Sequence, residues 1–232
     1  MKRATYLLGF ALIALFIFSN SGAEAINPTI AERFANASGG EDADYSGSYS
    51  FDKNHSAISF RVRHMGLVDV IGFFRDFTGT INYNAKDVSK STVEFAAQAT
   101  SVDTGVAPRD THLRSADFFE VEKFKEITFK STKVDSSGKT LMVTGDFTMK
   151  GVTKSITFPV NVAGFLPGNE RGGPTMGSTA KTVINRRDYG INYGSKLPNG
   201  ALALSDDVEI DLQIEAKGPK PAAPAAAPAP KP

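Results

Sequence analysis

The chain has 232 residues, enough for one sizeable domain with tails, and no cysteine, so disulfides and cysteine-linked lipids are excluded. Its 26 Lys and Arg residues are balanced by 25 Asp and Glu residues, for a formal net charge of +1. This balance excludes the positive surplus with which nucleic-acid-binding proteins meet phosphates. It also gives no electrostatic reason for adsorption to an anionic membrane.

The N-terminus has the three parts of a secretory signal peptide. Lys2 and Arg3 give a positive start, a mostly apolar run extends from Tyr6 to Phe18, and small residues follow at Ala23-Glu24-Ala25. An uncleaved membrane anchor is the alternative, but the run is shorter than the roughly 20 residues that a spanning helix needs. We therefore expect a signal peptide over residues 1–25, cleaved after Ala25, and export of the protein.

Weakly patterned segments flank the central region. Residues 26–44 include Ser38-Gly39-Gly40-Glu41-Asp42 and are expected to form a flexible leader. Residues 218–232 consist almost entirely of Pro, Ala and Lys, which favours an extended, solvated and disordered tail. A spacer is the simpler interpretation of the tail, and docking to a partner or crossing the cell wall is the alternative.

The central residues 45–217 alternate between apolar and polar side chains, as strands with one buried face do. The clearest case is Val208 to Glu215, where Val, Ile and Leu alternate with Glu, Asp and Gln. The expected strands, in chain order, are 57–64, 70–83, 93–99, 126–134, 141–149, 156–165, 176–184 and 208–215. About eight strands in succession, joined by short turns and without helical patterns between them, predict an all-β sandwich or barrel.

Some residues interrupt the strand patterns. Pro159 is expected at an edge, an end or a bulge, because proline cannot donate to a ladder. Four strand glycines predict sharp bends, as where a sheet curls into a barrel: Gly72, Gly79, Gly145 and Gly164. Residues 109–119 are the one segment with helical character, and we expect a short turn there at most.

Phenylalanine dominates the aromatic residues, with seventeen Phe, six Tyr and no Trp. An ordinary packed core and an apolar lumen both explain this, because an eight-stranded barrel is either filled by side chains or holds one ligand. The residues assigned to the lumen by their place in the alternation are Phe60, Val62, Phe73, Phe77, Phe95, Phe129, Phe147 and Phe158.

Six motifs follow one another along this region. They are Asp52-x-x-His55-Ser56-x-Ile58-x-Phe60-x-Val62-x-His64-x-Gly66; Gly72-x-Phe74-x-x-Phe77-x-Gly79; Asp103-Thr104-Gly105 with Arg109-Asp110-x-His112-Leu113-Arg114-Ser115-x-Asp117-Phe118-Phe119; Ile127-Thr128-Phe129-x-Ser131-Thr132; Gly145-Asp146-Phe147-Thr148-Met149-x-Gly151-Val152-Thr153; and Asn185-Arg186-x-Asp188-Tyr189-Gly190-Ile191. In this order, the chain resembles the YceI-like family of polyisoprenoid-binding proteins over about residues 45 to 216. Phe124-Lys125 departs from the Tyr-Pro pair common in the family.

The resemblance implies an extended, lipocalin-like, eight-stranded antiparallel barrel with an apolar lumen. It also implies non-enzymatic binding, with transport or storage, of a long-chain isoprenoid lipid such as an isoprenoid quinone or a polyprenyl phosphate, in the periplasm. No catalytic cofactor is expected. The residues expected around the head group, at the mouth of the lumen, are His64, Arg109, Asp110, His112, Arg114, Arg186, Arg187 and Asp188.

Several alternatives remain open. Each arginine either contacts the head group or pins a loop through a neighbouring aspartate, and His64 is either a ligand contact or a satisfied core residue. Three histidines could bind zinc, although their spacing does not require a metal. Catalysis by His55 and Ser56 or by Asp110 and His112 is a weaker alternative, because adjacent strand residues face opposite sides. An accessory role beside a membrane redox or stress-response complex, a homodimer and transient membrane contact also stay open.

Overall fold

The computed structural model describes residues 44–137, 140–169 and 172–219. The expected signal peptide, the leader up to residue 43 and the tail from residue 220 lie outside these ranges. No helix in the described ranges is long and apolar enough to cross a membrane.

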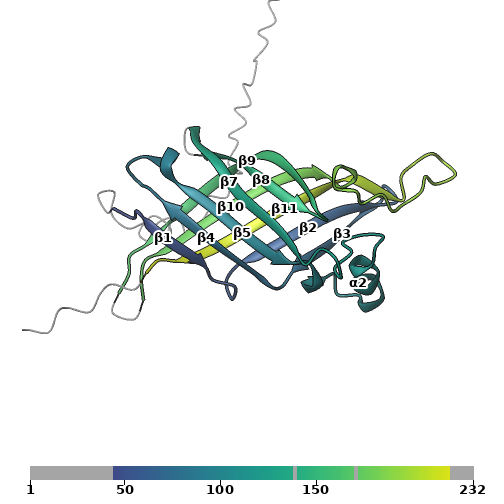
Figure 1. Cartoon of the computed structure of the whole chain (residues 1–232), viewed down its shortest axis with the longest axis horizontal. Coiled ribbons are helices and arrows are strands. Elements are labelled where there is room, and N and C mark those ends of the chain that lie inside the picture. The colour runs from purple at the N-terminus through teal and green to yellow at the C-terminus, as the bar shows by residue number, and fades with distance from the viewer. Residues whose placement is uncertain (1–43, 138–139, 170–171, 220–232) are drawn as a thin grey trace, which may run out of the picture. The chain divides into compact units, whose positions relative to one another are not determined.

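Strands make up most of the described chain and pair antiparallel in one sheet (Figure 1). They are β1 (Gly47–Phe51), β2 (Ala57–His64), β3 (Val68–Phe74), β4 (Phe77–Tyr83), β5 (Thr92–Gln98), β6 (Val102–Asp103), β7 (Glu126–Ser137), β8 (Thr140–Met149), β9 (Val152–Leu166), β10 (Thr175–Asn185) and β11 (Leu204–Lys217). The helical segments are η1 (Val88–Lys90), η2 (Ala99–Ser101), α2 (Ala107–Arg114) and η3 (Arg186–Tyr189).

The sheet closes into a barrel because β11 pairs with two strands placed end to end. At its C-terminal end, Lys217 lies opposite Ser50 of β1. The preceding part of β11, up to Gln213 opposite Ala57, pairs with β2. In the same way β3 continues into β4, and β5 into β6. The described strands therefore form the eight-stranded antiparallel barrel that the sequence predicts.

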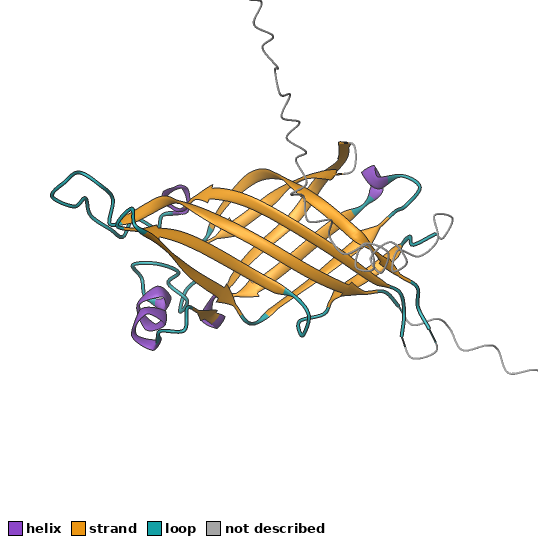
Figure 2. Ribbon diagram, turned by 180° about the vertical axis from the view of Figure 1, so that it is seen from behind, coloured by secondary structure: helices purple, strands orange, loops and turns teal. Residues whose placement is uncertain are grey.

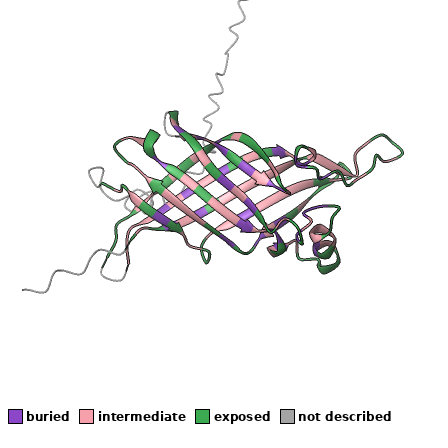
Figure 3. Cartoon of the chain, in the orientation of Figure 1, coloured by how far each residue is buried: buried purple, intermediate pink, exposed green. Residues whose placement is uncertain are grey.

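The register of the strands places the apolar phase on the inside. Phe60 lies opposite Ile210 on β11, whereas Arg61 lies opposite Glu209 on the outer face. Because paired residues share one face of a sheet, each hairpin adds matched side chains to the interior. Buried and more exposed positions accordingly follow one another along the strands (Figure 3).

Glycines let aromatic rings lie against the backbone of the neighbouring strand. A Cβ at Gly72 would overlap the ring of Phe60, its partner across the β2–β3 hairpin, and a Cβ at Gly79 would overlap the ring of Phe51. Gly164 has φ 148° and lies beside a register shift between β9 and β10. The strand glycines thus allow aromatic rings to pack closely on the backbone, in addition to allowing bends.

Pro159 lies next to the point where β9 and β10 stop pairing. It pairs with Met142 on one side, while the ladder between β9 and β10 stops at the next residue, Val160, opposite Ala180. Proline has no N–H to continue that ladder, so its position agrees with the expected end. Beyond this point η3 lies beside β9, and its Tyr189 is buried against Phe147 with ring centroids 5.5 Å apart.

Helix α2 is longer than the turn that we expected over residues 109–119. It has eight residues, Ala107–Arg114, with Pro108 in its first turn. Arg114 donates to the carbonyls of Thr100 (2.8 Å) and Val102 (2.7 Å), which fastens the end of the helix to the β5–β6 link. Only one of its residues is buried, so the apolar periodicity that reveals most helices is absent.

One end of the barrel carries α2, the turn between β2 and β3, and the connection 190–203; we call it the mouth end. The view from behind shows the larger helix and the longest loop at this same end (Figure 2). The turn and the connection are joined directly, because Met65 N–H donates to the Ala203 carbonyl at 2.9 Å.

Gly145 provides a test of the close approach between strands. In Gly145→Ala, the new Cβ would overlap the Lys130 carbonyl and lie 2.7 Å from the Ser131 Cα, so we expect a loss of about 1 to 3 kcal/mol in the free energy of unfolding. Gly177→Ala is the matched control, because its nearest neighbour would be Ala163 Cβ at 3.6 Å. Urea unfolding measures both variants, and equal stabilities would contradict the steric account.

An ion pair at the seam between β1 and β2 gives a pH dependence. His55 Nδ1 lies 2.9 Å from Asp52 Oδ2, and this hydrogen bond raises the pKa of His55 and lowers the pKa of Asp52. A raised histidine pKa stabilises the fold fully below the unfolded value of about 6.5 and loses that effect as pH rises through the folded value. The aspartate contribution is present above its unfolded pKa and is lost as pH falls through its lowered folded value.

We therefore expect His55→Gln to reduce the free energy of unfolding near pH 5.5 and to leave it nearly unchanged near pH 9. Urea unfolding of the natural protein and the variant at both pH values measures the difference. A difference that is the same at both values would show that the ion pair does not contribute.

Candidate functional site

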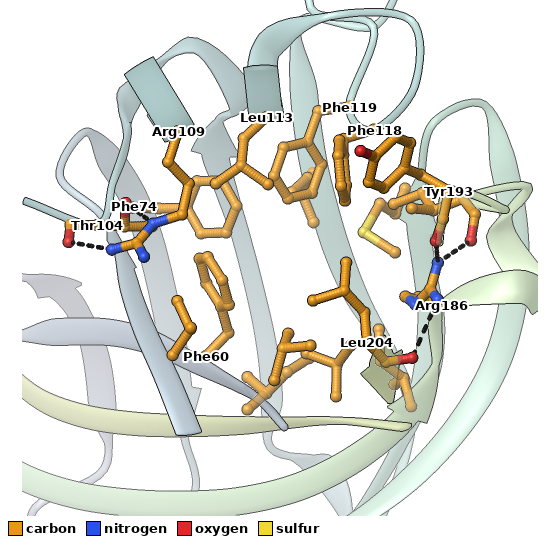
Figure 4. A pocket seen from close by; sticks show the side chains of 18 of the residues that line it. Phe60, Phe74, Thr104, Arg109, Leu113, Phe118, Phe119, Arg186, Tyr193 and Leu204 are labelled. Carbon is orange, nitrogen blue, oxygen red and sulfur yellow. Dashed lines mark hydrogen bonds between the residues drawn. The ribbon is translucent and has the colours of Figure 1, made fainter. Parts of the chain in front are cut away.

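A cavity of about 710 Å³ opens at the mouth end of the barrel. Its wall is mostly apolar and comes from seven strands, together with α2 and the segment that follows it (Figure 4). The seven strands are β2, β3, β5, β7, β8, β10 and β11. The polar side chains in the lining are Ser59, His64, Thr104, Arg109, His112, Arg186, Tyr193 and Ser195. A volume of this size, with few polar groups, is typical of a small-molecule site.

Phenylalanines separate this cavity from the other end of the barrel. Phe95 lines both the large cavity and a second space of only about 60 Å³, where Phe129 and Phe158 also lie. The ring centroids are 5.7 Å apart for Phe95 and Phe129, and 5.2 Å apart for Phe129 and Phe158. The interior is therefore partly hollow and partly filled, rather than one continuous tunnel.

The predicted lumen residues divide among these regions. Those in the wall of the large cavity are Phe60, Val62, Phe95 and Phe147. Phe129 and Phe158 line the small space, and Phe77 is buried in the core without lining either space.

The assignment of Phe73 to the lumen is contradicted, and its neighbour Phe74 takes that place. Phe74 lies opposite Ile58 and lines the cavity, so it belongs to the inner face of β3. Phe73 has the opposite phase and lies under the Arg75 guanidinium, 4.3 Å from the ring centroid. Two consecutive phenylalanines left the phase of β3 ambiguous, and only the register against β2 resolves it.

The segment from α2 to residue 119 covers one side of the cavity with apolar side chains. Leu113, Phe118 and Phe119 all contribute to the lining, and Figure 4 shows them side by side. Phe119 packs edge-on against Phe74, with centroids 5.5 Å apart, which connects this segment to β3. This segment therefore presents apolar side chains to the cavity beside the polar ones of Arg109 and His112.

Arg186 is a structural residue although it lines the cavity. Its side chain is buried and donates to the carbonyls of Ser205 (2.9 Å), Ile191 (2.8 Å) and Tyr193 (2.7 Å). It also reaches Asp206 at 3.1 Å, while burial lowers the pKa of its guanidinium below the usual value. These bonds hold the start of the 190–203 connection against β11.

Four other predicted mouth residues do not line the cavity. Arg114 fastens α2, and Asp110 is buried where it accepts from the Thr104 N–H at 2.9 Å. Arg187 donates to Asp206 at 2.6 Å, and Asp188 forms an exposed ion pair with Lys154 at 3.4 Å. Arg114 and Arg187 thus fasten neighbouring segments, but through backbone carbonyls and Asp206 rather than through Asp110, Asp117 or Asp188.

Three further predicted mouth residues line the cavity: Arg109, His64 and His112. Arg109 donates to Thr104 through Nε (2.7 Å to Oγ1) and Nη2 (3.0 Å to the carbonyl), but no hydrogen bond of its Nη1 is found among the described residues. His112 Nε2 lies 2.8 Å from Asp117 Oδ2. Arg109 lies on the opposite side of the cavity from Arg186 (Figure 4).

The histidines do not form a zinc site in the described ranges. His64 and His112 line the cavity, whereas His55 lies at the seam beside Asp52 and Glu215. That seam group is the one set of three close potential ligands found in the described residues. Lys217 pairs with both of its carboxylates, so a cation already balances their charge.

Tyr193 is the clearest site residue that the sequence did not reveal. It lines the cavity from the 190–203 connection, with its ring 4.7 Å from His112 and 4.9 Å from Phe118 between centroids. No periodic pattern marks a residue in a loop. Strand residues such as Leu204, Val208 and Ile210 also line the cavity, and the alternation of the last strand already indicated an inner face for the latter two.

Comparison with known proteins agrees with this architecture. The chain is 39% identical over 163 residues to a UPF0312 protein of Shewanella sp. strain ANA-3, covering 69% of this chain and 81% of the relative. It is 37% identical over 173 residues to protein YceI of Escherichia coli O157:H7, covering 73% of this chain and 85% of the relative.

Two solved structures share the fold. BcnA of Burkholderia cenocepacia has a TM-score of 0.62 at 21% identity, over 72% of this chain and 99% of that chain. A polyisoprenoid-binding domain of Saccharophagus degradans, implicated in plant cell wall breakdown, has a TM-score of 0.56 at 18% identity, over 74% and 98%. Residues 49–216 match the YceI-like domain family, and the chain belongs to it.

Proposed function

We propose that the protein binds a long-chain isoprenoid lipid in the mouth-end cavity, without catalysis, and carries or stores it in the periplasm. The observation that carries the proposal is the cavity itself, about 710 Å³ with a largely apolar wall. The family membership and the polyisoprenoid-binding domain of similar fold support it. The signal-peptide features of residues 1–25 support export.

The energetics of transfer favour an isoprenoid tail in such a cavity. Burial of one methylene is worth roughly 0.8 kcal/mol, so a prenyl chain gains a large free energy on leaving water. Ordering of the chain and its alternative place in a bilayer offset much of that gain. Exchange between protein and membrane is therefore energetically accessible, as a carrier requires.

The polar contacts favour a neutral head group, such as a quinone, over a polyprenyl phosphate. Arg186 already uses its donors on loop carbonyls and Asp206, and Arg114 and Arg187 do not line the cavity. Among the described residues, Arg109 is the guanidinium at the cavity that keeps N–H donors available, on Nη1 and on one side of Nη2. A single cation suits a carbonyl, whereas phosphate groups are commonly held by several cations.

The side-chain contacts do not favour the catalytic alternatives. His112 pairs with Asp117 rather than Asp110, and Asp110 accepts from Thr104. Ser56 donates to the Glu215 carbonyl, while the His55 ring is directed to Asp52. Ser56 is therefore not placed to act with His55, and Asp110 is not placed to act with His112.

Solvent extraction and mass spectrometry of mature protein from a bacterial periplasm, purified without detergent, test the proposal. We expect a stoichiometric isoprenoid lipid, and the identity of its head group distinguishes a quinone from a phosphate. Protein that carries no lipid and takes up no added quinone would contradict the proposal. Lipid that is found only when a membrane protein co-purifies would favour the accessory role.

Val62→Trp tests whether the lipid lies in this cavity. Val62 and its partner Val208 on the neighbouring strand both line the cavity, so an indole at position 62 fills space that a tail would need. We expect lipid occupancy to fall by at least about tenfold. Val183→Trp places the same residue on an exposed position of β10 and should retain occupancy. Equal occupancy in both variants would contradict the site.

Arg109→Gln tests the head-group contact. Loss of a hydrogen bond from a charged donor should weaken the binding of a short-chain isoprenoid quinone by about tenfold. Arg187→Gln is the matched control, because Arg187 does not line the cavity. Titration of the quinone in detergent micelles measures both, with thermal unfolding as the check on folding. Unchanged affinity in Arg109→Gln would show that Arg109 only holds the loop at Thr104 and does not contact the head group.

A further inference from the structure

The turn between β2 and β3 exposes large apolar side chains beside the cavity. The exposed fractions are 44% for Met65, 75% for Leu67 and 60% for Val68. Tyr193, at 45%, is exposed on the neighbouring connection. Met65 and Tyr193 also line the cavity, so the exposed apolar surface is continuous with the cavity wall. We call these four residues the tip.

The backbone of the tip is held in a tight turn with most of its polar groups bonded. Met65 (φ 52°) and Gly66 (φ 74°) both adopt the left-handed conformation, and Leu67 N–H donates to the His64 carbonyl at 2.9 Å. Arg63 Nη1 donates to the Leu67 carbonyl at 3.2 Å. Bonded backbone groups lower the cost of placing this turn in an environment of low polarity.

The charges behind the tip are paired. Arg63 lies 2.9 Å from Asp69; Arg63 precedes Met65 by two residues, and Asp69 directly follows Val68. The hairpin part of the tip therefore ends in a few apolar residues, and the charges of Arg63 and Asp69 balance each other behind them. Tyr193 adds an aromatic ring of the kind that is enriched where membranes meet water.

We propose that the tip is a membrane-contact surface that inserts into the outer part of a lipid bilayer and brings the cavity mouth to it. This proposal rests on the proposed function, because an isoprenoid ligand resides in a bilayer. The contact is driven by apolar burial, so a zwitterionic bilayer suffices and salt has little effect. A peptide or protein surface would need no such continuity between the exposed residues and the cavity wall.

Sedimentation with phosphatidylcholine vesicles tests the contact. The mature protein should bind, and raising the salt from about 0.05 to about 0.5 M should change the binding less than about twofold. The double variant Leu67→Glu and Val68→Glu should bind at least about tenfold more weakly. Val183→Glu is the control, since it places one such charge on another exposed valine and should bind like the natural protein.

A second measurement tests the contact without the double variant. Because the chain has no cysteine, Leu67→Cys gives a single site for an environment-sensitive fluorophore. Emission from position 67 should shift to shorter wavelength with phosphatidylcholine vesicles, and emission from Val183→Cys should not. A shift at neither site, or the same shift at both, overturns the proposal.

Three results of the sedimentation assay also overturn it: no binding by the natural protein, equal binding by the double variant, or loss of binding at high salt. Uptake of quinone from detergent micelles separates this proposal from the proposed function. If the protein takes up quinone from micelles but fails these vesicle tests, only the proposed membrane contact is contradicted. Protein that carries no lipid and takes up no quinone contradicts the proposed function, whatever the vesicle result.

Discussion

Closure of the sheet through β11 is the constraint on which the interior depends. This one strand pairs with β10 along one edge and with β1 and β2 along the other, so the chain's last strand joins its first two. Eight strands set an interior width that side chains can either fill or leave open. Glycines beneath the rings of Phe51 and Phe60 allow the wall to carry large side chains without widening.

Within that frame, the mouth end is built by polar contacts rather than by ladder pairing. The β9–β10 ladder ends beside Pro159, and short segments take over from the strands. Arg186 holds the 190–203 connection, and Arg114 holds α2. These two arginines thus position side chains such as Tyr193 and Leu113 around the cavity.

The sequence predicted what depends on local pattern. The alternation of residues 208–215 and the turns between strands were sufficient for the fold class, and the ordered motifs were sufficient for the family. Three features required tertiary information. The phase of Phe73 and Phe74 depends on register against β2, helix α2 depends on contacts with η2 and β6, and the role of Arg186 depends on carbonyls far along the chain.

The phenylalanines between the two interior spaces have a kinetic consequence. Because Phe95 lies between the large cavity and the small one and stacks on Phe129, the large cavity has a floor opposite the mouth end. A chain-like molecule that enters through the mouth end with one end leading must leave through the mouth end with that end last. Loading and unloading through the mouth end then compete with each other, and the depth of the floor limits how much of a long chain the protein encloses.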